Sequence, residues 1–82
     1  MKFYIYVLKS ELNKSYYVGS TENINDRVKL HNSWLVQSTK RYIPWDLVYR
    51  EEFPNLSLAR KRELKIKSWK KRAAIEKLIS NA

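Results

Sequence analysis

The N-terminal part of the chain contains four side chains whose types together can cut a phosphodiester: Tyr6, Tyr17, Arg27 and His31. Cleavage of this bond requires neutralised charge at the phosphorus, an activated water and a stabilised leaving oxygen. A phenol whose pKa lies near 10 needs a nearby cation or base to act as a general base at neutral pH. An arginine and a histidine close to two tyrosines therefore form a candidate catalytic set.

Arg27 and His31 are spaced by one turn of a predicted helix. Asn23 can cap a helix from Ile24 to about Leu35, and Asp26 is favourably placed in the first turn. This spacing puts both polar side chains on the same side of the helix.

A helical wheel places this polar pair inside the apolar arc. The arc consists of Ile24, Val28 and Leu35 on one side and Leu30 and Trp34 on the other. Burial of polar groups without partners is costly. Taken alone, Arg27 could extend its guanidinium to solvent, and His31 could be a hydrogen-bonded histidine at the boundary of the core. The two together, facing the sheet, favour a site.

Tyr6 and Tyr17 lie in two predicted strands that a hairpin can pair. If Tyr6 lies opposite Tyr17, their side chains share one face of the sheet. The sequence does not determine this register, and Tyr4 and Tyr16 remain competitors. Gly19, the only glycine, follows the second strand and suggests a special dihedral angle or a close backbone approach.

Glu63 is a candidate metal ligand in a later helix that is otherwise rich in basic residues. It borders the apolar stripe of that helix, whereas Arg62 falls within the stripe. An ion pair with Lys67, worth about 0.3–0.5 kcal/mol, is one interpretation of Glu63. The other is a hard oxygen ligand for Mg²⁺, which usually takes one or two carboxylates plus waters and phosphate oxygens.

The elements that must position these residues are predicted in the order ββαβαα. Two strands and a helix are followed by a third strand and two helices, predicted at 3–8, 16–19, 24–35, 47–53, 58–69 and 72–79. The first strand is apolar on both faces and is expected at the centre of the sheet. Ser57 is the predicted cap of the fifth element. The fold class is therefore α+β, a small three-stranded antiparallel sheet flanked by helices.

The charge distribution indicates a polyanion as partner. The net charge is +9, from 17 basic and 8 acidic residues. Nine basic residues between positions 60 and 77 outnumber two acidic ones: Arg60, Lys61, Arg62, Lys65, Lys67, Lys70, Lys71, Arg72 and Lys77. A basic stripe of this kind favours nucleic acid ahead of anionic membrane. The simpler alternative is a well-solvated basic surface.

Length and composition predict one cytoplasmic domain over residues 1–82. The absence of cysteine excludes disulfides and thiolate metal ligands and fits a reducing cytoplasm. The longest apolar run, 3–8, is too short for a membrane span or a signal-peptide core, so no membrane is expected.

These residues resemble the motifs of the GIY-YIG nucleases, in the same order. Tyr4-Ile5-Tyr6 and Tyr17-Val18-Gly19 stand for the two tripeptides, Arg27 and His31 for the helix signature, and Glu63 for the metal-binding glutamate. The resemblance covers essentially the whole chain and is closest to the small stand-alone bacterial proteins similar to YhbQ. The tripeptides are weakly specific, but the order and spacing of all the parts are strongly specific.

The resemblance implies an endonuclease that uses one divalent cation, Mg²⁺ or Mn²⁺. Glu63 would hold the metal, and Arg27 would bind the scissile phosphate. Tyr6 would position or deprotonate the attacking water with help from His31, and Tyr17 would orient the phosphate or the nucleophile. The substrate would be nucleic acid, DNA ahead of RNA, in a role such as repair or recombination. Seven further residues are expected to contact it: Gly19, Arg60, Lys61, Lys67, Lys70, Lys71 and Arg72.

Three departures from the family pattern stand beside this hypothesis. Tyr4 replaces the usual glycine of the first tripeptide, and Ser20 stands where UvrC-like members carry a lysine. The chain also has no room for a separate DNA-binding domain, which leaves a role for a protein partner that supplies specificity. A non-catalytic nucleic-acid-binding module is the alternative function, and a generic basic RNA-binding protein is a third.

Overall fold

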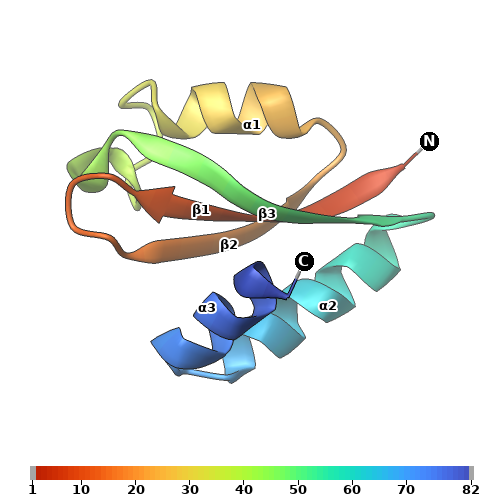
Figure 1. The fold of residues 1–82 in the computed structure, drawn as a ribbon. Coiled ribbons are helices and arrows are strands. Elements are labelled where there is room, and N and C mark those ends of the chain that lie inside the picture. Colours follow the sequence, from red (N-terminus) through yellow and green to blue (C-terminus); the bar gives the residue numbers. More distant parts are fainter. Residues whose placement is uncertain (1, 82) are drawn as a thin grey trace.

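The computed structural model describes residues 2–81, which form a three-stranded sheet with helices on both faces (Figure 1). The order of elements is the predicted ββαβαα, with one 3₁₀ turn, Lys40–Tyr42, added before the third strand. The strands and helices are β1 (Phe3–Ser10), β2 (Tyr16–Thr21), α1 (Ile24–His31), β3 (Trp45–Phe53), α2 (Leu56–Ser68) and α3 (Arg72–Ser80). The α+β fold class is confirmed.

Strand β1 is central, as its apolar sequence predicted, and both of its neighbours are antiparallel. Its four residues from Ile5 to Leu8 are all buried. Because side chains alternate along a strand, Ile5 and Val7 face one side of the sheet while Tyr6 and Leu8 face the other.

Two separate cores result from this alternation. Helices α2 and α3 cover one face, where Ile5, Val7 and Val18 pack with Ala59 and Ile66 of α2 (Figure 1). Helix α1 covers the other face. There Tyr6 and Leu8 pack with Ile24 and Trp45, and Tyr4, Tyr17, Val28 and Ile43 lie around them.

The predicted extent of the first helix was wrong. Asn23 caps it through its side chain, which accepts from the backbone of Asp26, but α1 ends at His31 instead of Leu35. The side chain of Asn32 instead pairs with the backbone of Trp45 at 2.7 and 3.0 Å. Trp34 then takes a positive φ of 72°, and Trp34 and Leu35 are 67% and 78% exposed. The apolar arc is therefore shorter than the wheel suggested.

The predicted cap of α2 was also wrong. The side chain of Asn55, and not that of Ser57, accepts from the Leu58 backbone at 2.9 Å, so the helix begins at Leu56. Arg62 occupies its unexpected place in the apolar stripe because its guanidinium donates twice to Glu51 of β3, at 2.9 and 3.1 Å. A bidentate pair of this kind satisfies the half-buried charge.

None of the helices in residues 2–81 has the length and apolarity needed to cross a membrane. The longest of them, α2, has 13 residues.

Candidate active site

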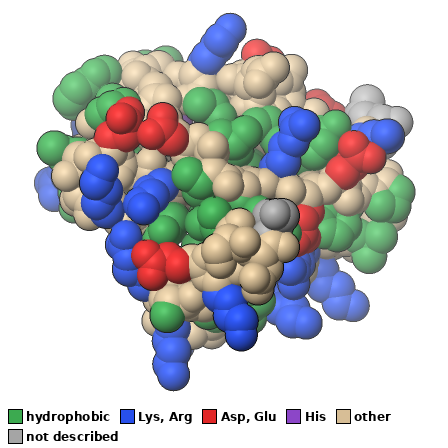
Figure 2. Space-filling model, in the orientation of Figure 1, with side chains coloured by type: hydrophobic (Ala, Val, Ile, Leu, Met, Phe, Trp, Pro, Cys, Tyr) green, Lys and Arg blue, Asp and Glu red, His purple; other side chains and the backbone are tan. Residues whose placement is uncertain are grey.

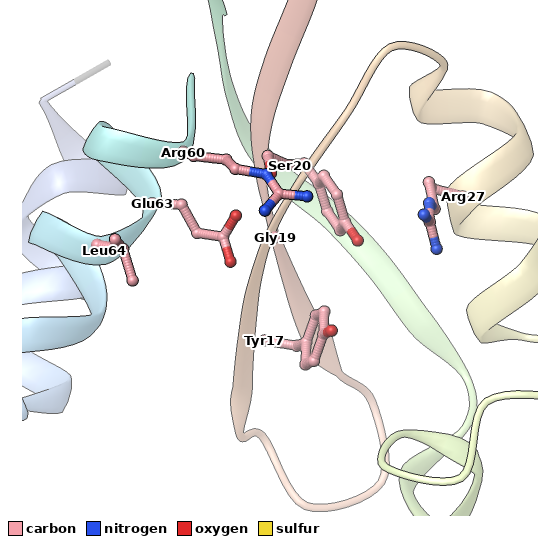
Figure 3. Close-up of a pocket in the computed structure, with 8 residues that line it drawn as sticks. Tyr17, Gly19, Ser20, Arg27, Arg60, Glu63 and Leu64 are labelled. Atoms are coloured by element: carbon pink, nitrogen blue, oxygen red, sulfur yellow. The ribbon is translucent and has the colours of Figure 1, made fainter. Parts of the chain in front are cut away.

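A pocket of about 320 Å³ lies at the β2 edge of the sheet, where side chains from both faces meet. Tyr6 and Tyr17 reach it from the α1 face, and Arg60 and Glu63 reach it from α2. Figure 3 shows Glu63 and Arg27 on opposite sides of Gly19 and Ser20, with the strand between the two helices. The pocket is lined by Tyr6, Tyr17, Gly19, Ser20, Arg27, Arg60, Glu63 and Leu64.

The tyrosine pair shares a face, although not by direct pairing. Tyr6 lies opposite Gly19, and Tyr17 lies opposite Leu8. The offset of two residues keeps both phenols on the α1 face, with ring centroids 6.4 Å apart. Of the two competitors, Tyr4 lines a different hollow and Tyr16 packs on the α2 face.

Gly19 allows the Tyr6 ring to cross β2 and reach the pocket. A Cβ at position 19 would lie 2.5 Å from the Tyr6 hydroxyl oxygen and 2.7 Å from Cζ. The backbone of Gly19 does not have a positive φ. Of the two roles predicted for this glycine, close approach is therefore confirmed and the special dihedral angle is wrong.

His31 lies behind Tyr6 and is hydrogen-bonded through both ring nitrogens. Its Nε2 is 3.0 Å from the Tyr6 hydroxyl oxygen, and its Nδ1 is 2.9 Å from the Thr39 hydroxyl oxygen. The Tyr17 ring lies against it, with centroids 4.7 Å apart. Burial and the nearby Arg27 guanidinium lower the pKa of His31, so the imidazole is neutral at pH 7.

The environment of Tyr6 keeps its phenol protonated. Burial, with a smaller contribution from Tyr17, raises the pKa of Tyr6 to about 12, although Arg27 acts in the opposite direction. A free phenolate is therefore rare at neutral pH. The hydrogen bond to a neutral imidazole provides another route by which Tyr6 can lose a proton.

Arg27 and His31 occupy different environments despite their one-turn spacing. Arg27 is exposed and lines the pocket, while His31 is 1% exposed and lies behind Tyr6. The arginine is thus accessible to a ligand, and the histidine acts through a neighbour.

Glu63 provides the single carboxylate of the pocket lining. Its Oε2 accepts from Lys67 Nζ at 2.6 Å. Burial acts to raise the pKa of Glu63, but hydrogen bonds from Lys67 and Ser20 outweigh it and lower the pKa, so the group is ionised at neutral pH. Within residues 2–81, no three His, Asp or Glu side chains gather as a ready-made metal cage. One ionised carboxylate in an open pocket fits Mg²⁺, which keeps waters and takes phosphate oxygens as further ligands.

The predicted nucleic-acid contacts fall into two groups besides Gly19. Arg60 lines the pocket itself. A neighbouring groove of about 410 Å³ between β2 and the α2–α3 turn is lined by Lys67, Lys70, Lys71 and Arg72, and Tyr17 lines both hollows. Lys61 is exposed and lines neither. Figure 2 shows many Lys and Arg side chains over the region of α2 and α3.

Thr39 is a site residue that the sequence did not predict, as are Ser20 and Leu64 of the pocket lining. Position 39 lies in a stretch interpreted only as a polar loop, yet the residue is completely buried against His31. A buried imidazole needs partners at both nitrogens, and that need was the available signal. Loops have no side-chain periodicity, so nothing in the sequence identified which hydroxyl would meet it.

The fold is that of a nuclease domain. The GIY-YIG catalytic domain matches residues 2–77, and the chain belongs to this nuclease family. It is 36% identical to UPF0213 protein SH2523 of Staphylococcus haemolyticus over 92% of each chain. It is 39% identical to UPF0213 protein SSP2268 of Staphylococcus saprophyticus, over 96% of this chain and 95% of the relative.

A solved structure has the same fold. The solution NMR structure of the UPF0213 protein BH0048 from Bacillus halodurans matches with a TM-score of 0.61 and 31% identity. The match covers 98% of this chain and 84% of that chain. The resemblance to small bacterial GIY-YIG proteins is therefore confirmed.

Proposed function

We propose that this protein is a divalent-metal-dependent endonuclease that hydrolyses phosphodiester bonds in DNA. The observation that carries the proposal is the convergence of Tyr6, Arg27 and Glu63 on one pocket from three elements, with His31 hydrogen-bonded to Tyr6. A phenol, a guanidinium and a carboxylate in one pocket supply the three functions that phosphodiester hydrolysis requires.

The proton of the attacking water passes through Tyr6 to His31. As the water gives a proton to the Tyr6 oxygen, the phenol proton moves to His31 Nε2 across the 3.0 Å hydrogen bond. The resulting hydroxide forms the new P–O bond, and the leaving oxygen departs with the electrons of the broken bond and takes a proton from solvent. His31 then returns its proton to the Tyr6 oxygen, and Tyr6 releases one to solvent in the pocket. This relay fits a neutral imidazole beside a phenol whose pKa is too high for a stable phenolate.

Charge on the phosphate is neutralised from both sides of β2. Arg27 binds a non-bridging oxygen from the α1 side, and Arg60 adds a second cation from α2. Glu63 would hold one Mg²⁺ or Mn²⁺, which when bound supplies Lewis-acid stabilisation of the phosphate oxygens. Tyr17, in contact with the His31 ring, orients the phosphate or the nucleophile.

The substrate strand follows the basic groove next to the pocket. Lys67, Lys70, Lys71 and Arg72 hold phosphates there, so binding should fall steeply with salt and depend little on sequence. DNA is preferred to RNA, with a role in repair or recombination and a protein partner that adds specificity. A reducing cytoplasm suits a chain without cysteine.

A cleavage screen tests this function. Duplex, single-stranded, flap and branched DNA, together with RNA, are incubated with Mg²⁺ and with Mn²⁺. We expect cleavage of a DNA that Glu63→Gln and Arg27→Ala each reduce about 10²–10³-fold, the usual cost of removing a group that stabilises developing charge. Lys29→Ala, which removes an exposed cation from the same helix as Arg27, is the matched control and should leave cleavage unchanged.

The second candidate function is a non-catalytic nucleic-acid-binding module. The ion pair between Lys67 and Glu63 favours it, because it occupies the carboxylate that a metal would need. Filter binding over a salt series distinguishes the two functions. Wild-type protein that binds with a steep salt dependence, yet cuts none of the screened substrates with either metal, would replace the nuclease with this module.

A further inference from the structure

Thr39 is the residue on the far side of His31 from the pocket. Its hydroxyl oxygen lies 2.9 Å from His31 Nδ1, while Tyr6 takes Nε2. The exposed fractions of Thr39 and His31 are 0% and 1%. Bulk water is therefore excluded from the contact between the two side chains. The Thr39 hydroxyl is the hydrogen-bond partner of His31 Nδ1.

The backbone of Thr39 is itself held in place. Its carbonyl oxygen accepts from Trp45 Nε1 at 2.8 Å, and its N–H donates to the Val36 carbonyl at 3.2 Å. The backbone of Trp45 is in turn paired with the Asn32 side chain. The hydroxyl thus sits on a chain segment anchored to the start of β3, and its position relative to the imidazole is restricted.

We propose that Thr39 is a positioning residue, whose hydroxyl accepts the Nδ1 proton of His31 and so leaves Nε2 unprotonated toward Tyr6. The inference rests on the proposed nuclease function for its catalytic consequence. In a neutral imidazole, the hydrogen bond at one nitrogen selects the tautomer at the other. With the opposite tautomer, Nε2 would carry a proton and could not receive the one that Tyr6 releases.

Within residues 2–81, Thr39 is the one hydrogen-bond partner of His31 Nδ1. The ionisable groups around its ring are Tyr6 from β1, Tyr17 from β2 and Arg27 from α1. The two tyrosines lie on the pocket side, and a guanidinium has no acceptor to offer. Thr39 is therefore the group that can accept a hydrogen bond from Nδ1.

The test is the tautomer of His31, read from long-range ¹H–¹⁵N correlations of the single histidine at neutral pH. Wild-type protein and Thr39→Ser should show protonated Nδ1 and unprotonated Nε2, and Thr39→Val should show a mixture or the reverse. Ser10→Ala is the matched control, because Ser10 is also completely buried and its hydroxyl donates to the Tyr42 carbonyl, in the turn after Thr39, and is not hydrogen-bonded to His31. It should keep the wild-type tautomer.

On the DNA that the screen shows to be cut, Thr39→Val should lower kcat with little change in KM, and Thr39→Ser should restore it. We expect a loss of about 10–100-fold, as seen when the group that orients a metal-binding histidine is removed. An equal loss in Ser10→Ala would indicate a merely structural effect and overturn the proposal.

The two proposals fail separately. Wild-type His31 with a protonated Nε2 overturns the role of Thr39 even if Thr39→Val does not fold. Absence of cleavage by the wild type overturns the nuclease function. The tautomer measurement would still show whether Thr39 keeps the proton of His31 on Nδ1.

Discussion

The two faces of the sheet differ in what their side chains do. On the α2–α3 face the buried cluster is apolar throughout, from Ile5 and Val7 to Ile66. On the α1 face, Tyr6, His31 and Thr39 form a buried chain of hydrogen bonds. Adjacent residues of β1 serve opposite faces, so one strand supports both an apolar core and a polar network.

This difference places a purely apolar cluster on one face and a buried polar network on the other. An apolar core stabilises through burial and packing, while a buried polar network has to be fully satisfied to be tolerated. In residues 2–81 every buried side-chain polar atom has a partner. The faces combine at the β2 edge, where Glu63 from α2 joins the groups of the α1 face.

The largest loss of stability should come from a change on the α2–α3 face. Ile66→Ala removes a fully buried side chain and should lower the free energy of unfolding by about 2–5 kcal/mol. Leu64→Ala, on the same helix but 66% exposed, should cost less than about 0.5 kcal/mol. Urea unfolding of both variants measures the contrast. Equal costs would mean that the α2–α3 face is not the main stabilising core.

Gly19→Ala should disturb the hydrogen-bonded network on the α1 face. The added Cβ would overlap the Tyr6 hydroxyl oxygen and ring, so we expect a loss of about 1–3 kcal/mol in unfolding free energy and displacement of Tyr6 from His31. Addition of Tyr6→Phe should recover part of the loss, because the nearest clashing atom is then gone. Urea unfolding of the wild type, both single variants and the double variant gives a double-mutant cycle. Unfolding free-energy changes that simply add would contradict the clash between position 19 and Tyr6.

The stability contributed by the α1 face should also decrease in acid. The pKa of His31 is lowered on folding, chiefly by burial, so the unfolded chain binds the proton more readily. Its contribution to stability is complete above the unfolded value of 6.5 and is lost as the pH falls from there toward the folded value. Urea unfolding at pH 7.5 and 5.5 should show this loss in wild type and less of it in His31→Gln. An unchanged pH dependence in the variant would exclude His31 as its source.

The smallest effect concerns the junction between the faces. Lys67→Met removes the cation paired with Glu63 and should tighten Mg²⁺ or Mn²⁺ binding by about twofold, since such ion pairs are worth about 0.3–0.5 kcal/mol. Backbone amide shifts near Glu63 follow the titration with Mg²⁺. Glu63→Gln should abolish those shifts, and their persistence would place the metal elsewhere.

Local features of the chain were predictable because they depend on neighbours in sequence. The apolar run of β1, the cap at Asn23 and the order of elements follow from periodicity and hydrogen-bonding preference. The predicted site residues Tyr6, Tyr17, Arg27 and Glu63 do meet in one pocket. These residues were selected because their types and order resemble the GIY-YIG motifs. Their catalytic roles remain predictions.

Contacts between distant segments were decided only by the tertiary structure. The offset that sets Tyr6 over Gly19 depends on the hairpin register, and the early end of α1 depends on the pairing of Asn32 with Trp45. Thr39 meets His31 because the start of β3 anchors a loop that has no periodic signal of its own. Sequence patterns report which face a side chain takes within its own element, but which elements then share an edge depends on how all of them pack together.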